Sequence, residues 1–137
     1  MFTHTTNIRV RYGETDQMGI MYYGNYALYY EVGRVEAIRS LGVTYKSLEE
    51  DGIGMPVVRL ESKFLKPAYY DDLLRITTTI PEIPDRFINF QVIIHNEDNH
   101  IIHKAKVVLC FQDFQTGSMI KAPAKIVEKL KPYFADA

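Results

Sequence analysis

The segment GETDQMGIMYYGNY, residues 13–26, places one aspartate, Asp16, among apolar and aromatic side chains. A carboxylate fixed in such surroundings could activate a water molecule or attack a carbonyl carbon. The segment then leads into a predicted helix, whose first N–H groups are free to bind a negatively charged oxygen. The alternative is that Asp16 is only a turn residue or a helix-side cap, and composition alone favours that interpretation.

Other kinds of reactive site have weaker support in the sequence. The histidines show no metal-ligand spacing, and Cys110 is most simply a small hydrophobic residue in a strand. A GxSxG nucleophile elbow and a glycine-rich phosphate loop are both missing from the sequence, which argues against a serine hydrolase and a nucleotide-phosphate site. Asp16 is therefore the main candidate for chemistry.

Length and composition indicate an ordinary globular protein. The chain has 137 residues, which predicts a single domain over residues 1–137. The net charge of −1, with acids and bases interspersed, gives no basic face for nucleic acid. No apolar run is long enough to span a membrane, and the N-terminus lacks the plan of a signal peptide. With a single cysteine as well, we expect a cytoplasmic protein.

A long helix is predicted directly after the Asp16 segment. It runs from Gly24 or Asn25 to Leu41, with Asn25 as a plausible N-cap and Gly42 as the C-terminal stop. Apolar residues cover most of its circumference, which is typical of a buried helix. A short second helix is expected from Thr44 to Glu50.

The rest of the chain changes to the period of two that marks β-strands. Alternating segments occupy residues 4–12, 57–67, 73–80, 87–95 and 101–111, and a last helix begins at Ala122 or Pro123 and ends at Leu130. One-sided strands need a cover, and the long helix is the only large apolar body available. We therefore expect an α+β fold with an antiparallel sheet around that helix. Apolar Ile93, Ile102 and Val108 on the second sheet face hint at oligomerisation.

Two blocks of the sequence resemble the hot-dog-fold thioesterases. The first block, RVRYGETDQMGIMYYGNYALYYEVGRVEAI, is similar to the active-site signature of the 4-hydroxybenzoyl-CoA and Tol–Pal-associated thioesterase branch. The matching positions are Asp16, Gly19, Ile20-Met21, Tyr22-Tyr23, Asn25 and Tyr26. The second block, VVRLESKFLKPAYYDDLLRITTTI, also resembles that family. The resemblance covers nearly the whole chain and implies an antiparallel sheet wrapped around one long central helix.

The resemblance implies hydrolysis of an acyl-CoA thioester to a free acid and coenzyme A. Asp16 would be the nucleophile or the general base, and the backbone amides of Tyr23 and Gly24 would bind the thioester oxygen, with Tyr23 the first choice. Many relatives have His at the position of Tyr23, so an acid–base role for its side chain is not implied. The resemblance implies no metal or organic cofactor, because coenzyme A is part of the substrate.

Further residues are candidates for substrate binding: Met21, Tyr22, Asn25, Arg59, Lys63 and Lys66. Each has a simpler interpretation. Asn25 is favoured as a helix cap, tyrosines of this segment can fill the core, and the three cations are favoured as a solvated sheet face. Contact with the phosphates of coenzyme A is the alternative for the cations.

Two other functions stay open. An acyl-ACP thioesterase would keep the chemistry and use a basic surface for its acidic carrier, for which Arg59, Lys63, Lys104 and Lys106 are candidates. A non-catalytic acyl-binding protein would keep only the fold, and Asp16 argues against it. By resemblance, the substrate groove lies between subunits, which implies a homodimer or homotetramer.

Overall fold

The computed structural model describes residues 1–134. Its strands and helices, in chain order, are β1 (Phe2–Arg9), α1 (Tyr26–Ser40), α2 (Tyr45–Glu50), β2 (Ile53–Gly54), β3 (Val57–Phe64), β4 (Leu73–Ile80), β5 (Phe87–His95), β6 (Ile101–Asp113), β7 (Met119–Ile120) and α3 (Ala124–Leu130). Three 3-10 turns, Tyr12–Glu14, Tyr23–Asn25 and Lys131–Tyr133, lie between or after them. No helix in the described residues has the length and apolar character that a membrane crossing requires.

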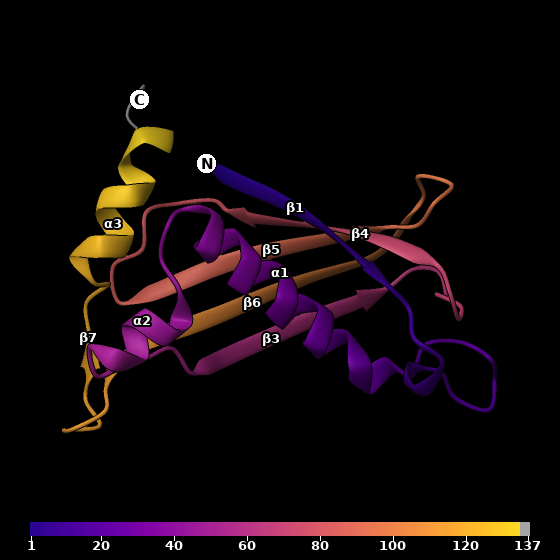
Figure 1. Cartoon of the computed structure of the whole chain (residues 1–137), viewed down its shortest axis with the longest axis horizontal. Helices are drawn as coiled ribbons and strands as arrows, with labels where there is room; N and C mark the ends of the chain where they lie inside the picture. The colour runs from indigo at the N-terminus through magenta and orange to yellow at the C-terminus, as the bar shows by residue number, and fades with distance from the viewer. Residues whose placement is uncertain (135–137) are drawn as a thin grey trace.

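The strands form one antiparallel sheet in the order β1-β4-β5-β6, with β3 on the other side of β6. The short strands β2 and β7 pair with the C-terminal part of β6. Helix α1 crosses one face of this sheet, as Figure 1 shows. The predicted α+β fold, with an antiparallel sheet and one long helix, is confirmed.

The core lies between α1 and the sheet. Strands β4 and β5 alternate strictly, and the four inward side chains of β5, from Ile88 to Ile94, are at most 1% exposed. Helix α1 contributes the buried side chains of Tyr29, Tyr30 and Ile38 to this core. The burial of these apolar side chains is the main force that holds the helix to the sheet.

Gly33 sets how closely α1 approaches β4. A Cβ atom at this position would lie 2.6 Å from Thr78 Oγ1 and 3.0 Å from Ile76 Cγ2. We expect Gly33→Ala to lower the free energy of unfolding by roughly 1–3 kcal/mol, because the added methyl group overpacks the interface. Urea unfolding measures the change. Gly13→Ala is the matched control, since a Cβ atom there has nothing within 4 Å. Equal stability of the two variants would contradict the prediction.

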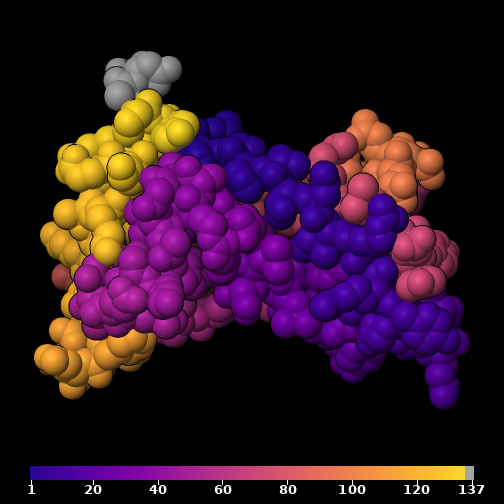
Figure 2. All heavy atoms as spheres, in the orientation of Figure 1, coloured from indigo at the N-terminus to yellow at the C-terminus, as the bar shows by residue number. Residues whose placement is uncertain are grey.

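The outer face of α1 is more exposed than the sequence suggested. Leu28 is 49% and Val32 is 40% exposed. The prediction of a helix buried over most of its circumference is therefore wrong for these residues, because the sheet covers only one side of α1. Figure 2 shows the purple surface of the helix uncovered across the middle of the molecule.

Strand β3 is exposed along its whole length. All eight of its residues are exposed, among them Val58 (51%) and Leu60 (47%). The strand lies at the edge of the sheet, and its apolar Val57, Val58 and Leu60 side chains remain about half exposed. The interpretation of Ile102 as part of an outer apolar face is also wrong. Ile102 falls at a β-bulge opposite Ile94 and His95, and the shifted alternation buries it completely.

Candidate active site

A tight turn between β1 and α1 fixes the side chain of Asp16. The Asp16 amide donates to the Ile20 carbonyl (3.0 Å), and the Gly19 amide donates to the Asp16 carbonyl (2.9 Å). Gly19 has φ of +79°, a conformation that favours glycine. The Met18 amide donates to Asp16 Oδ1 at 2.9 Å. Within the described residues, the second carboxylate oxygen of Asp16 accepts no hydrogen bond.

The start of the helical segment supplies two backbone amides without partners. The Tyr22 amide donates to the Glu14 carbonyl (2.9 Å), and the Asn25 amide donates to the Tyr22 carbonyl (3.0 Å). In residues 1–134, neither the Tyr23 nor the Gly24 amide has a hydrogen-bond acceptor. A Cβ atom at Gly24 would lie 2.7 Å from the Tyr22 ring, so a larger residue here would require that exposed ring to move. Two adjacent free donors at a helix start can bind a developing oxyanion.

Glu14 holds the Asp16 loop against α1, a role that was not predicted from the sequence. Its side chain is buried and accepts hydrogen bonds from the Arg11 amide (2.8 Å), the Arg11 guanidinium (3.1 Å) and the Tyr29 hydroxyl (2.7 Å). Its carbonyl oxygen accepts from the Tyr22 amide and the Asn25 side chain, both at 2.9 Å. The three-residue spacing of Arg11 and Glu14 suits a local ion pair, but nothing in the sequence marks the contact between Glu14 and Tyr29.

Hydrogen bonding keeps the Glu14 carboxylate charged. Burial acts to raise its pKa, but the hydrogen bonds from the Arg11 amide, the Tyr29 hydroxyl and the Arg11 guanidinium together lower the pKa below its ordinary value. A lowered pKa in the folded state means that the ionised carboxylate stabilises the fold above the unfolded-state pKa. That stabilisation is lost as the pH falls through the folded-state pKa.

We expect Glu14→Gln to lower the free energy of unfolding by roughly 1.5–3 kcal/mol at neutral pH. Glutamine replaces one carboxylate oxygen by an NH₂ group, which cannot accept a hydrogen bond from Arg11. The difference from the wild type should shrink as the pH falls through the lowered pKa of Glu14. Urea unfolding at neutral and acidic pH measures both effects. Glu49→Gln, at an exposed position, is the matched control. A difference that grew toward acidic pH would contradict the assignment.

A pocket of about 420 Å³ opens beside the Asp16 turn. Its lining residues are Asp16, Met18, Ile20, Met21, Tyr23, Tyr26, Phe64, Leu65, Lys66 and Pro67. It therefore brings together four of the predicted site residues, namely Asp16, Met21, Tyr23 and Lys66. The walls are mostly apolar, but the pocket is open to solvent, with Met18 80% and Tyr23 67% exposed.

Two predicted substrate-binding residues of the loop lie outside the lining of this pocket. The ring of Tyr22 is 46% exposed and packs beside the ring of Tyr23, with centroids 4.7 Å apart. The side chain of Asn25 donates to the Glu14 carbonyl. Asn25 does occupy the predicted N-cap position of α1, but its side-chain amide is engaged with the loop and makes no capping hydrogen bond.

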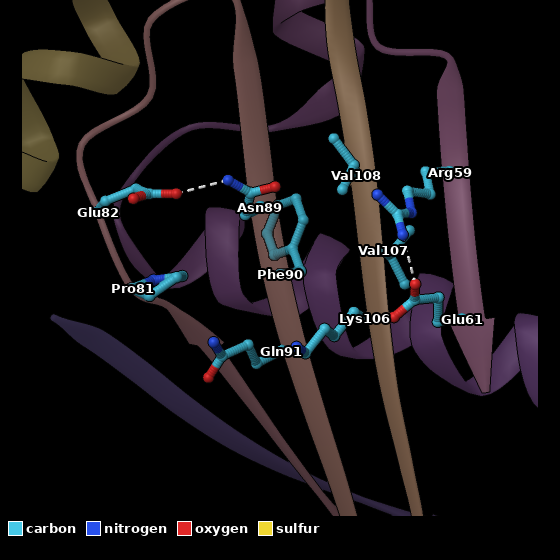
Figure 3. A pocket seen from close by; sticks show the side chains of 10 residues that line it. All are labelled: Arg59, Glu61, Pro81, Glu82, Asn89, Phe90, Gln91, Lys106, Val107 and Val108. Carbon is cyan, nitrogen blue, oxygen red and sulfur yellow. Dashed lines mark hydrogen bonds and ion pairs between the residues drawn. The ribbon is translucent and has the colours of Figure 1, made fainter. Parts of the chain in front are cut away.

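Arg59 and Lys63 lie on the sheet face that α1 does not cover, away from the Asp16 pocket. Arg59 lines a hollow of about 480 Å³, where it forms an ion pair with Glu61 at 2.6 Å (Figure 3). Lys63 lines the adjacent hollow of about 580 Å³ and stands opposite Lys104 on β6. The structure therefore separates these two cations from Lys66, which does line the pocket.

Comparison with known proteins identifies the family to which this chain belongs. Residues 10–130 match the family model of the Thioesterase-like superfamily, and the chain belongs to that family. The resemblance to hot-dog-fold thioesterases is thereby confirmed. The chain is also similar to a solved structure of a DHNA-CoA thioesterase from Staphylococcus aureus, with 30% identity, a TM-score of 0.85, and coverage of 99% of this chain and 86% of that one.

Two curated relatives carry related names. The acyl-CoA thioester hydrolase YbgC of Escherichia coli is 27% identical over 124 residues, which cover 90% of this chain and 92% of the relative. YneP of Bacillus subtilis, which has a provisional name as an acyl-CoA thioesterase, is 40% identical over 82 residues. That alignment spans 60% of this chain and 59% of YneP.

Proposed function

We propose that the protein hydrolyses acyl-CoA thioesters to a free acid and coenzyme A in the pocket beside Asp16. One observation carries the proposal. Asp16, whose carboxylate has one oxygen without a hydrogen bond, lines the same apolar pocket as Tyr23. The backbone amides of Tyr23 and Gly24, in the 3-10 turn that begins at Tyr23, have no acceptor in the described residues. Membership of the thioesterase-like family and the names of the relatives support it. We also expect a cytoplasmic location, with which a single cysteine is compatible.

The chemistry asks two things of this pocket. The Tyr23 and Gly24 amides bind the thioester oxygen as it gains negative charge. Asp16 then acts in one of two ways. As general base, it takes a proton from water while the oxygen of that water adds to the carbonyl carbon, and the coenzyme A thiolate leaves. As nucleophile, it attacks that carbon itself, expels the thiolate and forms a mixed anhydride that water cleaves. Neither route needs a metal or an organic cofactor.

We also propose that the working unit contains at least two copies of the chain, joined at β3. The strand is an open edge with free backbone groups and exposed apolar side chains, among them Val57, Val58 and Leu60, and this combination suits pairing with a second copy. Phe64 ends β3 and also lines the pocket, so a partner at this edge would border the site. The exposed Leu28 and Val32 of α1 support a further pairing into a tetramer.

We expect Leu60→Lys to shift the protein toward a single-chain mass in analytical ultracentrifugation, because a lysine in an apolar seam must be desolvated. Asp98→Lys, in the exposed turn between β5 and β6, is the control and should keep the wild-type mass. A Leu60→Lys protein with an unchanged mass would contradict pairing through β3.

An acyl-carrier protein is the runner-up substrate carrier. Lys63 and Lys104 lie side by side across β3 and β6, and neither has an ion-pair partner in the described part of the chain, which supports an acidic partner. This pair lies on the sheet face away from α1, whereas Lys66 lines the pocket itself, so we favour coenzyme A. A panel of the same acyl groups on both carriers distinguishes the two. Equal slow turnover by wild type and Asp16→Ala on every substrate would support a non-catalytic acyl-binding protein.

A further inference from the structure

We infer that His103 sets which acyl-chain lengths the pocket accepts, by supporting two aromatic residues that line it, Tyr26 and Phe64. The inference rests on the proposed thioesterase function and concerns the size of acyl group that the pocket accepts. His103 lies on β6 and does not line the pocket. Its ring is fully buried between α1 and the sheet.

The wall of the pocket rests on the imidazole of His103. The Tyr26 ring stacks on it, with centroids 4.1 Å apart and an interplanar angle of 16°. The Phe64 ring meets it edge-on at 4.7 Å, and Phe64 and Tyr26 are themselves perpendicular at 5.2 Å. Tyr26 and Phe64 both line the pocket that holds Asp16. The imidazole therefore fills the space behind both rings, and the buried Tyr26 ring, 4% exposed, cannot move back from the pocket while it is there.

A hydrogen-bond chain holds the imidazole in place. His103 Nε2 is hydrogen-bonded to the Tyr30 hydroxyl, which is also 2.8 Å from Ser62 Oγ. The chain links β6, α1 and β3, the three elements that carry His103, Tyr26 and Phe64. Among the described residues, His103 Nδ1 has no hydrogen-bond partner although it is buried. A buried polar ring at an aromatic wall is costly to keep, which favours a role beyond core filling.

The buried histidine acts as a neutral spacer. Burial lowers its pKa to about 4, so the ring is uncharged at neutral pH. It also does not line the pocket, so it has no direct contact with a substrate there. What His103 contributes is its volume and its orientation. When the volume of an apolar pocket changes by about one methylene group, the ratio of kcat/KM values for two substrates that differ by one methylene changes by roughly 10- to 200-fold. Removing the imidazole should therefore deepen the pocket and favour longer chains.

The test is a series of saturated acyl-CoA thioesters, from butyryl to palmitoyl, with wild type and His103→Ala. We expect the ratio of kcat/KM for the longest chain to that for the best wild-type substrate to rise about tenfold or more in His103→Ala. His103→Phe keeps a ring behind Tyr26 and should keep the wild-type order. Tyr30→Phe removes the hydroxyl that holds the imidazole but leaves the imidazole in the wall, so it should lower stability and shift the chain-length order by less than His103→Ala does.

Each outcome bears on the inference. A uniform loss of kcat/KM for all chain lengths in His103→Ala would overturn it, since a merely structural residue acts in that way. If His103→Ala does not fold, His103→Val should show a smaller shift in the same direction toward longer chains. Failure of both variants to fold would also overturn the inference. A wild-type protein that hydrolyses none of the thioesters would instead refute the proposed function, so the two failures are distinguishable.

Discussion

Asp16→Asn should hydrolyse acyl-CoA thioesters with a kcat lowered by roughly 10²- to 10⁴-fold, the range that a positioned acid–base group contributes. Asparagine keeps a side-chain oxygen that can accept the hydrogen bond from the Met18 amide, so the turn from Asp16 to Ile20 should stay intact. What is lost is the negative charge, and with it both the basicity and the nucleophilicity of the group. Release of the coenzyme A thiol, followed with a thiol reagent, measures the rate.

The control for this variant is Asp98→Asn, which makes the same chemical change in the exposed turn between β5 and β6. It should retain wild-type kcat and KM. If Asp16→Asn kept more than about a tenth of the wild-type kcat, the role of Asp16 as base or nucleophile would be refuted.

Tyr23→Pro should lower kcat by roughly 10²- to 10³-fold, because it removes one backbone donor to the oxyanion. The position tolerates proline well. Tyr23 is the first residue of the 3-10 turn, where proline is favoured, and Tyr22 before it has φ of −63° and ψ of 133°, which suit a residue that precedes proline. The Tyr23 amide has no acceptor in the described residues, so no hydrogen bond of the fold is lost.

The matched control is Tyr23→Ala, which removes the side chain and leaves the amide. The Tyr23 ring is 67% exposed, so its loss should affect stability little. The kcat of Tyr23→Ala should fall by much less than that of Tyr23→Pro. Equal kcat values for the two variants would mean that the side chain, and not the amide, contributes to the reaction.

The sequence predicted the regular parts of the fold well. The bounds of β4 and β5 match the predicted segments, because each strand alternates between the core and the outside and ends at a clear turn. The two-residue strands β2 and β7 carry no such pattern and could not be predicted. The first strand ends at Arg9, earlier than expected, because the 3-10 turn Tyr12–Glu14 follows.

The candidate site was predictable where one segment holds its parts. Asp16, Tyr23 and Gly24 fall within nine consecutive residues that also contain the helix start. Glu14 was not predictable, because its partner Tyr29 lies 15 residues away and a charged residue in a turn is ordinarily solvated. The exposure of β3 also escaped prediction, since alternation marks an apolar face without saying whether the same chain covers it.

The most direct test of the central claim is a crystal structure of Asp16→Asn with a bound acyl-CoA. We predict that the thioester oxygen lies about 2.7–3.1 Å from the amide nitrogen of Tyr23 or Gly24, with the side chain at position 16 beside the thioester carbon. A thioester bound elsewhere, such as on the sheet face of Arg59 and Lys63, or turned so that its oxygen points away from both amides, would contradict the account.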